Sequence, residues 1–155
     1  MGNDWRGSII AEAQAGTAVQ SVEITLQPND IMNMLNNPVT ILPAQGPGTQ
    51  TFPIFAVLQY DQNTTDYNLG SATQFFIGPA PNPMVNNVLQ PCGTNLINGS
   101  NGPGSQVAVM PQANVVLVPI AAVENVDLVI TQNGNTEFTM GDGTLFVVMY
   151  YIMCV

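Results

Sequence analysis

The sequence contains no histidine and no lysine, and Arg6 is its only basic residue. General acid–base catalysis most often uses histidine, and nucleophilic serine or cysteine sites need a base beside the nucleophile. This sequence therefore cannot form a Ser–His, Cys–His or lysine-based active site. Neutralising nucleic-acid phosphates takes several Lys or Arg groups, as does binding to an anionic membrane surface. We therefore expect no nucleic-acid partner and no membrane partner.

Charged residues of either sign are scarce. They make up 7% of the chain, against about 25% in typical soluble domains. The formal net charge is -9, and the 17 Asn and 12 Gln residues make most of the polar surface from uncharged amides. Disordered segments combine low hydrophobicity with high charge, whereas 46% of these residues are hydrophobic. The composition therefore predicts a folded β protein, and a length of 155 residues predicts one domain.

The sequence has only two cysteines, Cys92 and Cys154, and their spacing matches no metal or redox motif. We interpret them as two small buried or loop thiols, although a single bridge between them stays open. No carboxylate-rich calcium loop is present, and Asp61 and Asp66 with nearby carbonyls are only a weak calcium candidate. No segment has the features of a signal peptide. We expect no cofactor and no metal.

Paired carboxylates are the one catalytic arrangement that the composition leaves open, because glycosidases use two Asp or Glu side chains. The interpretation that we favour is scattered, solvated or loop carboxylates. The glycine- and proline-rich stretches at 46–48 and 102–104 lack the lysine of a phosphate-binding loop. We therefore expect no enzymatic activity. The carboxylates considered are Glu23, Glu124, Asp127, Glu137 and Asp142.

A strand followed by one short helix is predicted at the start of the domain. Residues 18–26 alternate, with Val22, Ile24 and Leu26 on one face. In the helix that follows, Asn29 is the expected cap, and Asp30 suits the positive N-terminal end. The stretch 36–38 ends the helix because its proline disfavours a helical predecessor. The residues that share a face at helical spacing are Ile31, Met34 and Leu35.

Short strands account for most of the remaining sequence. The four prolines between 79 and 91 exclude a central strand there. Asn133-Gly134 predicts a hairpin turn between its two flanking runs. The apolar run that ends the sequence predicts a strand covered on both faces, in the middle of a sandwich or at a subunit contact. The expected strands are 39–43, 52–60, 72–78, 106–110, 114–119, 126–132, 136–140 and 145–155.

Eight to ten short strands with regular turns predict an all-β fold. We expect an antiparallel β-sandwich, a single jelly roll with one short helix, over residues 18–155. Residues 1–17 are expected to form an N-terminal arm. Trp5 is the only tryptophan and lies beside the only arginine, Arg6. Tryptophan and arginine are favoured interface anchors.

Two interpretations of the N-terminal arm stay open. Trp5 packs on its own domain, or the arm leaves the domain and docks on a neighbour, with the small residues at 11–16 as its root. A second choice concerns the loop at 98–105, which is a surface connector or an exposed contact loop. The chain has no lysine to protect its sheet edges, so prolines, bulges or pairing with other copies must protect them. Because so few charges keep it monomeric, we expect a homo-oligomer. The candidate partner contacts are Trp5, Arg6, Ile9 and Ile10.

Several segments resemble small virion proteins of tailed bacteriophages. The N-terminal half carries Val22-Glu23-Ile24-Thr25-Leu26 and, at 41–48, Ile-Leu-Pro-Ala-Gln-Gly-Pro-Gly. Between them, Ile31 and the stretch Leu35-Asn36-Asn37-Pro38-Val39 continue the similarity. The C-terminal run from Gly141 to Val147, followed by Tyr150 and Tyr151, is similar to the closing strand of those proteins. This chain departs from them in having fewer basic residues in that strand.

The resemblance implies a single jelly roll that works in a virus particle. It implies a capsid decoration or cement protein that binds the outside of the head and stabilises capsomer contacts. The implied partners are copies of itself, as a homotrimer, and the major capsid protein. The alternative is a tail-fibre or baseplate module that binds host glycan or protein through Tyr60, Tyr67 and the loop at 98–105. A main shell protein is less favoured because no basic, genome-facing arm is present.

Overall fold

The computed structural model describes residues 18–99, 104–113 and 119–154. The predicted N-terminal arm, with Trp5, Arg6, Ile9 and Ile10, lies outside the described residues. The predicted strand at 114–119 also lies almost wholly outside them. In the part of the chain that is described, no helix is long and apolar enough to cross a membrane.

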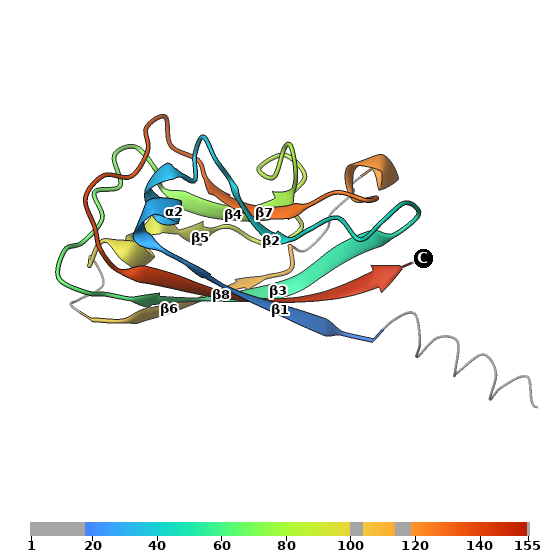
Figure 1. The fold of residues 1–155 in the computed structure, drawn as a ribbon, viewed down its shortest axis with the longest axis horizontal. Coiled ribbons are helices and arrows are strands. Elements are labelled where there is room, and N and C mark those ends of the chain that lie inside the picture. Colours follow the sequence, from blue (N-terminus) through green and yellow to red (C-terminus); the bar gives the residue numbers. More distant parts are fainter. Residues whose placement is uncertain (1–17, 100–103, 114–118, 155) are drawn as a thin grey trace, which may run out of the picture.

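Two four-stranded antiparallel sheets pack face to face (Figure 1). The strand order is β1-β8-β3-β6 in one sheet and β2-β7-β4-β5 in the other. The first sheet contains β1 (Gln20–Leu26), β8 (Thr144–Cys154), β3 (Gln50–Asp61) and β6 (Gln106–Pro111). The second contains β2 (Val39–Leu42), β7 (Leu128–Gln132), β4 (Gln74–Pro79) and β5 (Cys92–Gly93).

The pairing is nested along the chain. Strand β4 pairs with β5, β3 with β6, β2 with β7, and β1 with β8, all antiparallel. A chain folded once on itself and then rolled into two sheets gives this pattern, which is that of a jelly roll. The predicted all-β antiparallel sandwich is therefore confirmed, and it has one short α-helix among the described residues.

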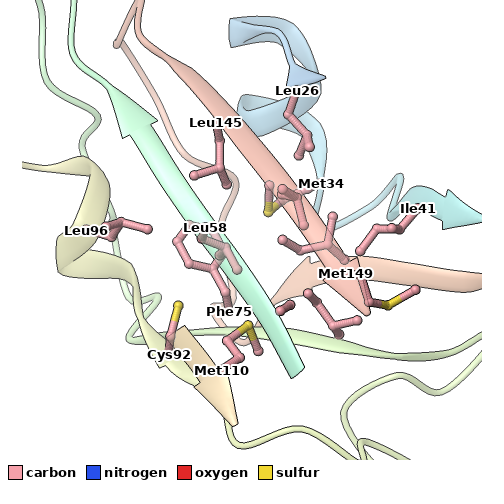
Figure 2. Close-up of a cluster of buried hydrophobic side chains, with 14 of the residues drawn as sticks. Leu26, Met34, Ile41, Leu58, Phe75, Cys92, Leu96, Met110, Leu145 and Met149 are labelled. Atoms are coloured by element: carbon pink, nitrogen blue, oxygen red, sulfur yellow. The ribbon is translucent and has the colours of Figure 1, made fainter. Parts of the chain in front are cut away.

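The core lies between the two sheets (Figure 2). Along β8 every second side chain is buried, and β1 places Leu26 against the same core. Full burial of such a side chain contributes about 1.5–3 kcal/mol. The second sheet supplies Phe75 and Ile130, both fully buried. Core residues of the first sheet include Leu58, Met110, Leu145, Val147 and Met149.

The helix α2 (Pro28–Asn33) lies where the sequence predicted it, but its cap differs. The N-cap is Gln27 rather than Asn29, because Pro28 occupies the first helical position, where its fixed φ and missing N–H are favourable. The Gln27 N–H donates to the Asp30 carboxylate at 2.9 Å. The helix ends at Asn33, before the predicted end at 36–38. The predicted apolar face is confirmed for Ile31 and Met34, both fully buried, while Leu35 is half-buried.

The predicted hairpin at Asn133-Gly134 is wrong, and so is the strand at 136–140. Strand β7 ends at Gln132, and the chain leaves its sheet there instead of turning back. The side chain of Asn133 accepts hydrogen bonds from the N–H groups of Thr73 and Gln74, at 2.9 and 3.0 Å. In the stretch 136–140, only Thr139 forms an isolated bridge, with Asn68. Asn133 therefore caps the start of β4 rather than a two-residue turn.

Two short 3-10 helices complete the described structure, η1 (Thr94–Ile97) and η2 (Ile120–Ala122). Between β4 and β5, the proline-rich stretch forms no strand, as predicted. Its only described β contact is an isolated bridge from Leu89 to Gln112.

Candidate functional site

Four of the five carboxylates considered for catalysis hold loops in place. Asp142 accepts hydrogen bonds from the N–H groups of Thr64 and Thr65, at 2.9 and 2.8 Å. Its other oxygen accepts from the Thr64 hydroxyl and from the Asn63 amide. These hydrogen bonds, that from the Thr64 hydroxyl first, hold the pKa of Asp142 below its usual value. Asp142 is thus a fixed acceptor that joins the loop before β8 to the loop after β3.

The other three loop carboxylates act in the same way. Glu137 accepts from the N–H groups of Leu35 and Asn36, at 3.0 and 2.9 Å. Asp127 accepts from the N–H of Ala44 at 2.8 Å, and Glu124 accepts from the N–H of Gly48 at 3.1 Å. Asp127 and Glu124 thus bind the loop between β2 and β3, and Glu137 binds the turn that follows α2. These side chains therefore form hydrogen bonds that hold loop backbone in place.

Tyr60 and Tyr67 belong to the core, so their predicted role as surface contacts is wrong. They are 1% and 2% exposed, and their rings meet edge to face with centroids 6.1 Å apart. The Tyr67 hydroxyl donates to the Gly143 carbonyl at 2.6 Å. Burial, with smaller contributions from Asp66 and Asp142, raises the pKa of Tyr60 to about 12. Both side chains are held inside the sandwich next to the Gly141–Gly143 turn.

The weak calcium candidate is not assembled by the fold. The Asp66 carboxylate accepts from the Gln62 amide at 2.7 Å, whereas Asp61 accepts from the Gln59 amide at 3.1 Å. Over residues 18–99, 104–113 and 119–154 there is no pocket and no group of three or more His, Cys, Asp or Glu side chains that could hold a metal ion. Cys92 and Cys154 are both free thiols, and burial raises the pKa of Cys92 to about 12.

One surface stands out by its composition, and we call it the outer sheet face. It consists of outward side chains from the middle of β1, β8, β3 and β6, in three cross-strand rows, and the pair Asp61 and Thr144 continues the same side of the sheet beyond the third row. The first row is Glu23, Val148, Val57 and Val109; the second is Ser21, Tyr150, Phe55 and Pro111; the third is Thr25, Phe146, Gln59 and Val107.

Apart from Gln59, the side chains that β8, β3 and β6 contribute to the three rows are apolar. Val107 and Val109 are 63% and 58% exposed, and the aromatic side chains are half-buried. The rings of Phe55 and Tyr150 stack with centroids 4.4 Å apart. Within these three rows Glu23 is the only charged residue. No described helix or strand lies against this face (Figure 1).

Sequence reasoning found only part of this surface. The unbroken apolar run at 145–155 predicted a strand covered on both faces, and the structure covers one face: the outward side chains of β8 are half-buried. The contributions of β3 and β6 were missed. The signal was present in β6, where Val107 and Val109 alternate with Ala108 and Met110, so that both parities are apolar.

No protein-family model matches the sequence, and no curated protein matches it. Three solved structures contain a chain to which this one is similar. The chain is similar to one in the cyanophage Pam1 capsid asymmetric unit, at 13% identity and a TM-score of 0.49, covering 88% of this chain and 86% of that chain. A chain in the capsid of Ralstonia phage GP4 matches at 13% identity and a TM-score of 0.38, covering 88% and 83%. A chain from the KBV activated particle at acidic pH matches at 10% identity and a TM-score of 0.27. The match covers 96% of this chain and 73% of that chain. Because these TM-scores lie below 0.5, we assign no function from them.

Proposed function

We propose that this protein is a bacteriophage virion structural protein, specifically a capsid decoration or cement protein. In this role it binds the outside of the head, associates with copies of itself as a homotrimer, and stabilises contacts between capsomers of the major capsid protein. The observation that carries the proposal is the outer sheet face, an apolar surface on a jelly roll. The jelly roll is an architecture of viral capsid and lectin domains.

The chemistry of the outer sheet face supports a role in assembly. The cores of protein interfaces are depleted in charge and enriched in aromatic residues. The stacked Phe55–Tyr150 pair, with valines on three neighbouring strands, has this composition. A surface of this kind fits a protein partner better than a soluble substrate.

The carboxylates and tyrosines also favour assembly over the other candidates. An enzyme would need the loop carboxylates, yet these are engaged by backbone N–H groups. The tail-fibre or baseplate alternative loses two of its expected contacts, because Tyr60 and Tyr67 are buried. We propose a phage particle because the segments at 22–48 and 141–151 resemble those of phage virion proteins. Its location is then the particle surface.

Binding to a capsid tests the proposal. Phage heads that lack this protein are mixed with the purified chain and sedimented, and the bound fraction is measured against concentration. We expect saturable binding, and a reconstruction of the complex with density on the outside of the head. A chain that stays in the supernatant at every concentration, or density found only at the tail, would contradict the proposal.

A matched pair of variants ties the binding to the surface. Val109→Asp places a carboxylate on the outer sheet face, where Val109 is 58% exposed. Val85→Asp makes the same change in the loop between β4 and β5, where Val85 is 81% exposed. An interface anchor contributes 2 kcal/mol or more, which is a factor of about thirty in affinity. We expect Val109→Asp to weaken head binding, and Val85→Asp to leave it within about twofold of the unsubstituted chain.

A further inference from the structure

We propose that the fold shields the Asn133–Gly134 pair from spontaneous deamidation, and that a chain which opens at this corner is modified there irreversibly. Asn133 follows β7 directly and binds the start of β4, the strand that pairs with β7. Its side chain is thus a modification site whose reactivity reports whether these two strands are joined. The proposal concerns the chemical durability of the protein and does not depend on its partners.

An Asn–Gly pair is chemically labile in an open chain. The backbone nitrogen of the glycine attacks Cγ of the asparagine, so that a C–N bond forms and ammonia leaves. Water then opens the resulting succinimide ring at either carbonyl carbon, which gives aspartate or isoaspartate. Glycine permits the attack because it has no Cβ to restrict its backbone. The reaction consumes only water, but Cγ of Asn133 must first reach the nitrogen of Gly134.

The carboxamide of Asn133 is held away from this reaction, toward β4. Its oxygen accepts hydrogen bonds from the N–H groups of Thr73 and Gln74, at 2.9 and 3.0 Å. Its nitrogen donates to the Thr73 hydroxyl at 3.0 Å. To turn onto Gly134, the side chain must release all three groups, and two backbone N–H donors at β4 lose this acceptor.

The backbone on both sides of the pair is also fixed. The N–H of Asn133 donates to the Gln74 carbonyl at 3.2 Å. The N–H of Asn135 donates to the Ser71 hydroxyl at 2.8 Å. The peptide between Asn133 and Gly134 therefore cannot rotate toward the side chain unless these contacts with the segment at 71–74 break.

The attacking nitrogen itself is engaged. The N–H of Gly134 donates to the side-chain oxygen of Gln132. Gln132 is fully buried, and its amide nitrogen donates to the Thr136 carbonyl at 2.9 Å. Gly134 is tightly packed as well, because an added Cβ would lie 2.9 Å from the backbone nitrogen of Ala72. Both reacting groups are thus held by separate partners in the folded chain.

The two products fit this corner differently. Aspartate at position 133 keeps the side-chain oxygens that the N–H groups of Thr73 and Gln74 need. In isoaspartate the main chain runs through Cγ, and the free carboxylate is attached directly to Cα. That carboxylate reaches one carbon less far toward β4, and the nitrogen of Gly134 is displaced from Gln132. A chain that has formed isoaspartate therefore cannot rebuild the corner.

Peptide mass spectrometry tests the shield. The full-length protein is incubated in mildly alkaline buffer with and without urea, and deamidation at Asn133 is followed by chromatography and mass of proteolytic peptides. Folded proteins are open in about one molecule in a thousand or fewer. We therefore expect deamidation at Asn133 to be about a hundredfold or more slower without urea. Chains aged in urea and then refolded should carry aspartate in the folded fraction and isoaspartate in the fraction that fails to fold.

A matched pair of variants tests the local contacts. Thr73→Val removes the hydroxyl that binds the Asn133 amide. Loss of one hydrogen bond should speed deamidation of the folded chain about fivefold. Thr139→Val makes the same change at an exposed residue whose backbone pairs with Asn68, and should stay within about twofold of the unsubstituted chain. The Asn98–Gly99 pair in the same samples reports opening of the whole domain.

Four results would overturn the inference. Equal rates at Asn133 with and without urea would show that the fold gives no shield. A faster rate in the folded chain would show that the two N–H donors on the carboxamide oxygen promote the attack. Equal acceleration of Asn133 and Asn98 by Thr73→Val would attribute the effect to global unfolding. Isoaspartate spread evenly between the folded and unfolded fractions would show that this corner tolerates it.

Discussion

The rings of Phe55 and Tyr150 stack on the solvent side of the β1-β8-β3-β6 sheet, with centroids 4.4 Å apart and planes inclined by 17°. The two residues are direct cross-strand partners, from β3 and β8. An aromatic pair of this kind contributes about 0.5–1.5 kcal/mol beyond the area that it buries. The pair therefore has two roles: it stabilises the sheet, and it presents a flat aromatic surface outward.

A double-mutant cycle on Phe55→Ala and Tyr150→Ala measures the first role. We expect a coupling energy of about 0.5–1.5 kcal/mol in urea unfolding, because either single change already removes the stack. If the double variant instead loses the sum of the two single-variant losses in unfolding free energy, the rings do not interact.

Gly141→Ala is expected to destabilise the domain by about 3 kcal/mol or more. Gly141 has a φ of +88°, and an added Cβ would lie within 2.6 Å of several ring atoms of Tyr67. Gly46→Ala is the matched control, because Gly46 has a φ of +108° with nothing within 4 Å of an added Cβ. Gly46→Ala should lower the free energy of unfolding only by the backbone strain, about 1–2 kcal/mol. Equal losses in urea unfolding would contradict the packing of Tyr67 on this turn.

Asn133→Ala is expected to cost about 1–2 kcal/mol, because the N–H groups of Thr73 and Gln74 lose their shared acceptor. Asn133→Asp keeps that acceptor and loses only the donor to the Thr73 hydroxyl. It should recover at least half of the loss at neutral pH. Equal losses for Asn133→Ala and Asn133→Asp in the unfolding free energy would contradict the role of the side-chain oxygen as acceptor.

The pH dependence of stability should include a contribution from Asp142. Its pKa is lowered in the folded state, so its stabilisation is fully present above the ordinary value near 3.9 and is lost as the pH falls through the folded value. Asp142→Asn removes this ionisation. The stability difference between the chain and this variant should therefore shrink below about pH 4. A difference that stays constant through the acid range would contradict the proposed hydrogen bonding.

The β-sandwich was predictable because local patterns and the tertiary structure agree. The alternation in 20–26 places Leu26 in the core, and the turn at 141–143 leads into a long strand of β-branched and aromatic residues. The order of the strands along the chain does not show which of them pair in a sheet. The nested pairing, with β1 beside β8, was not predicted and is seen only in the structure.

The errors arose where a side chain serves a distant segment. Asn133 was interpreted from its neighbour Gly134, but its amide binds the backbone at Thr73, sixty residues away. The stretch 136–140 has the composition of a strand. Its Glu137 side chain instead accepts hydrogen bonds from the N–H groups of Leu35 and Asn36. No window of local sequence contains these partners.

The candidate site was predictable only in part for a related reason. An apolar run shows that a strand has little polar surface, but it does not show which of its faces the fold leaves open. The outer sheet face became visible once the register aligned Val109, Val57 and Val148 in one row. The predicted contacts at Trp5, Arg6, Ile9 and Ile10 lie outside the described residues and stay predictions.

The central claim is that the protein works by associating with its own copies and with a larger particle. The most direct test is the mass of the purified full-length chain by sedimentation velocity, alone and after mixing with phage heads that lack it. We predict a species of three 16.5 kDa chains alone, and its transfer to the sedimenting heads after mixing. A single 16.5 kDa species at every concentration, unchanged by the heads, would contradict the claim.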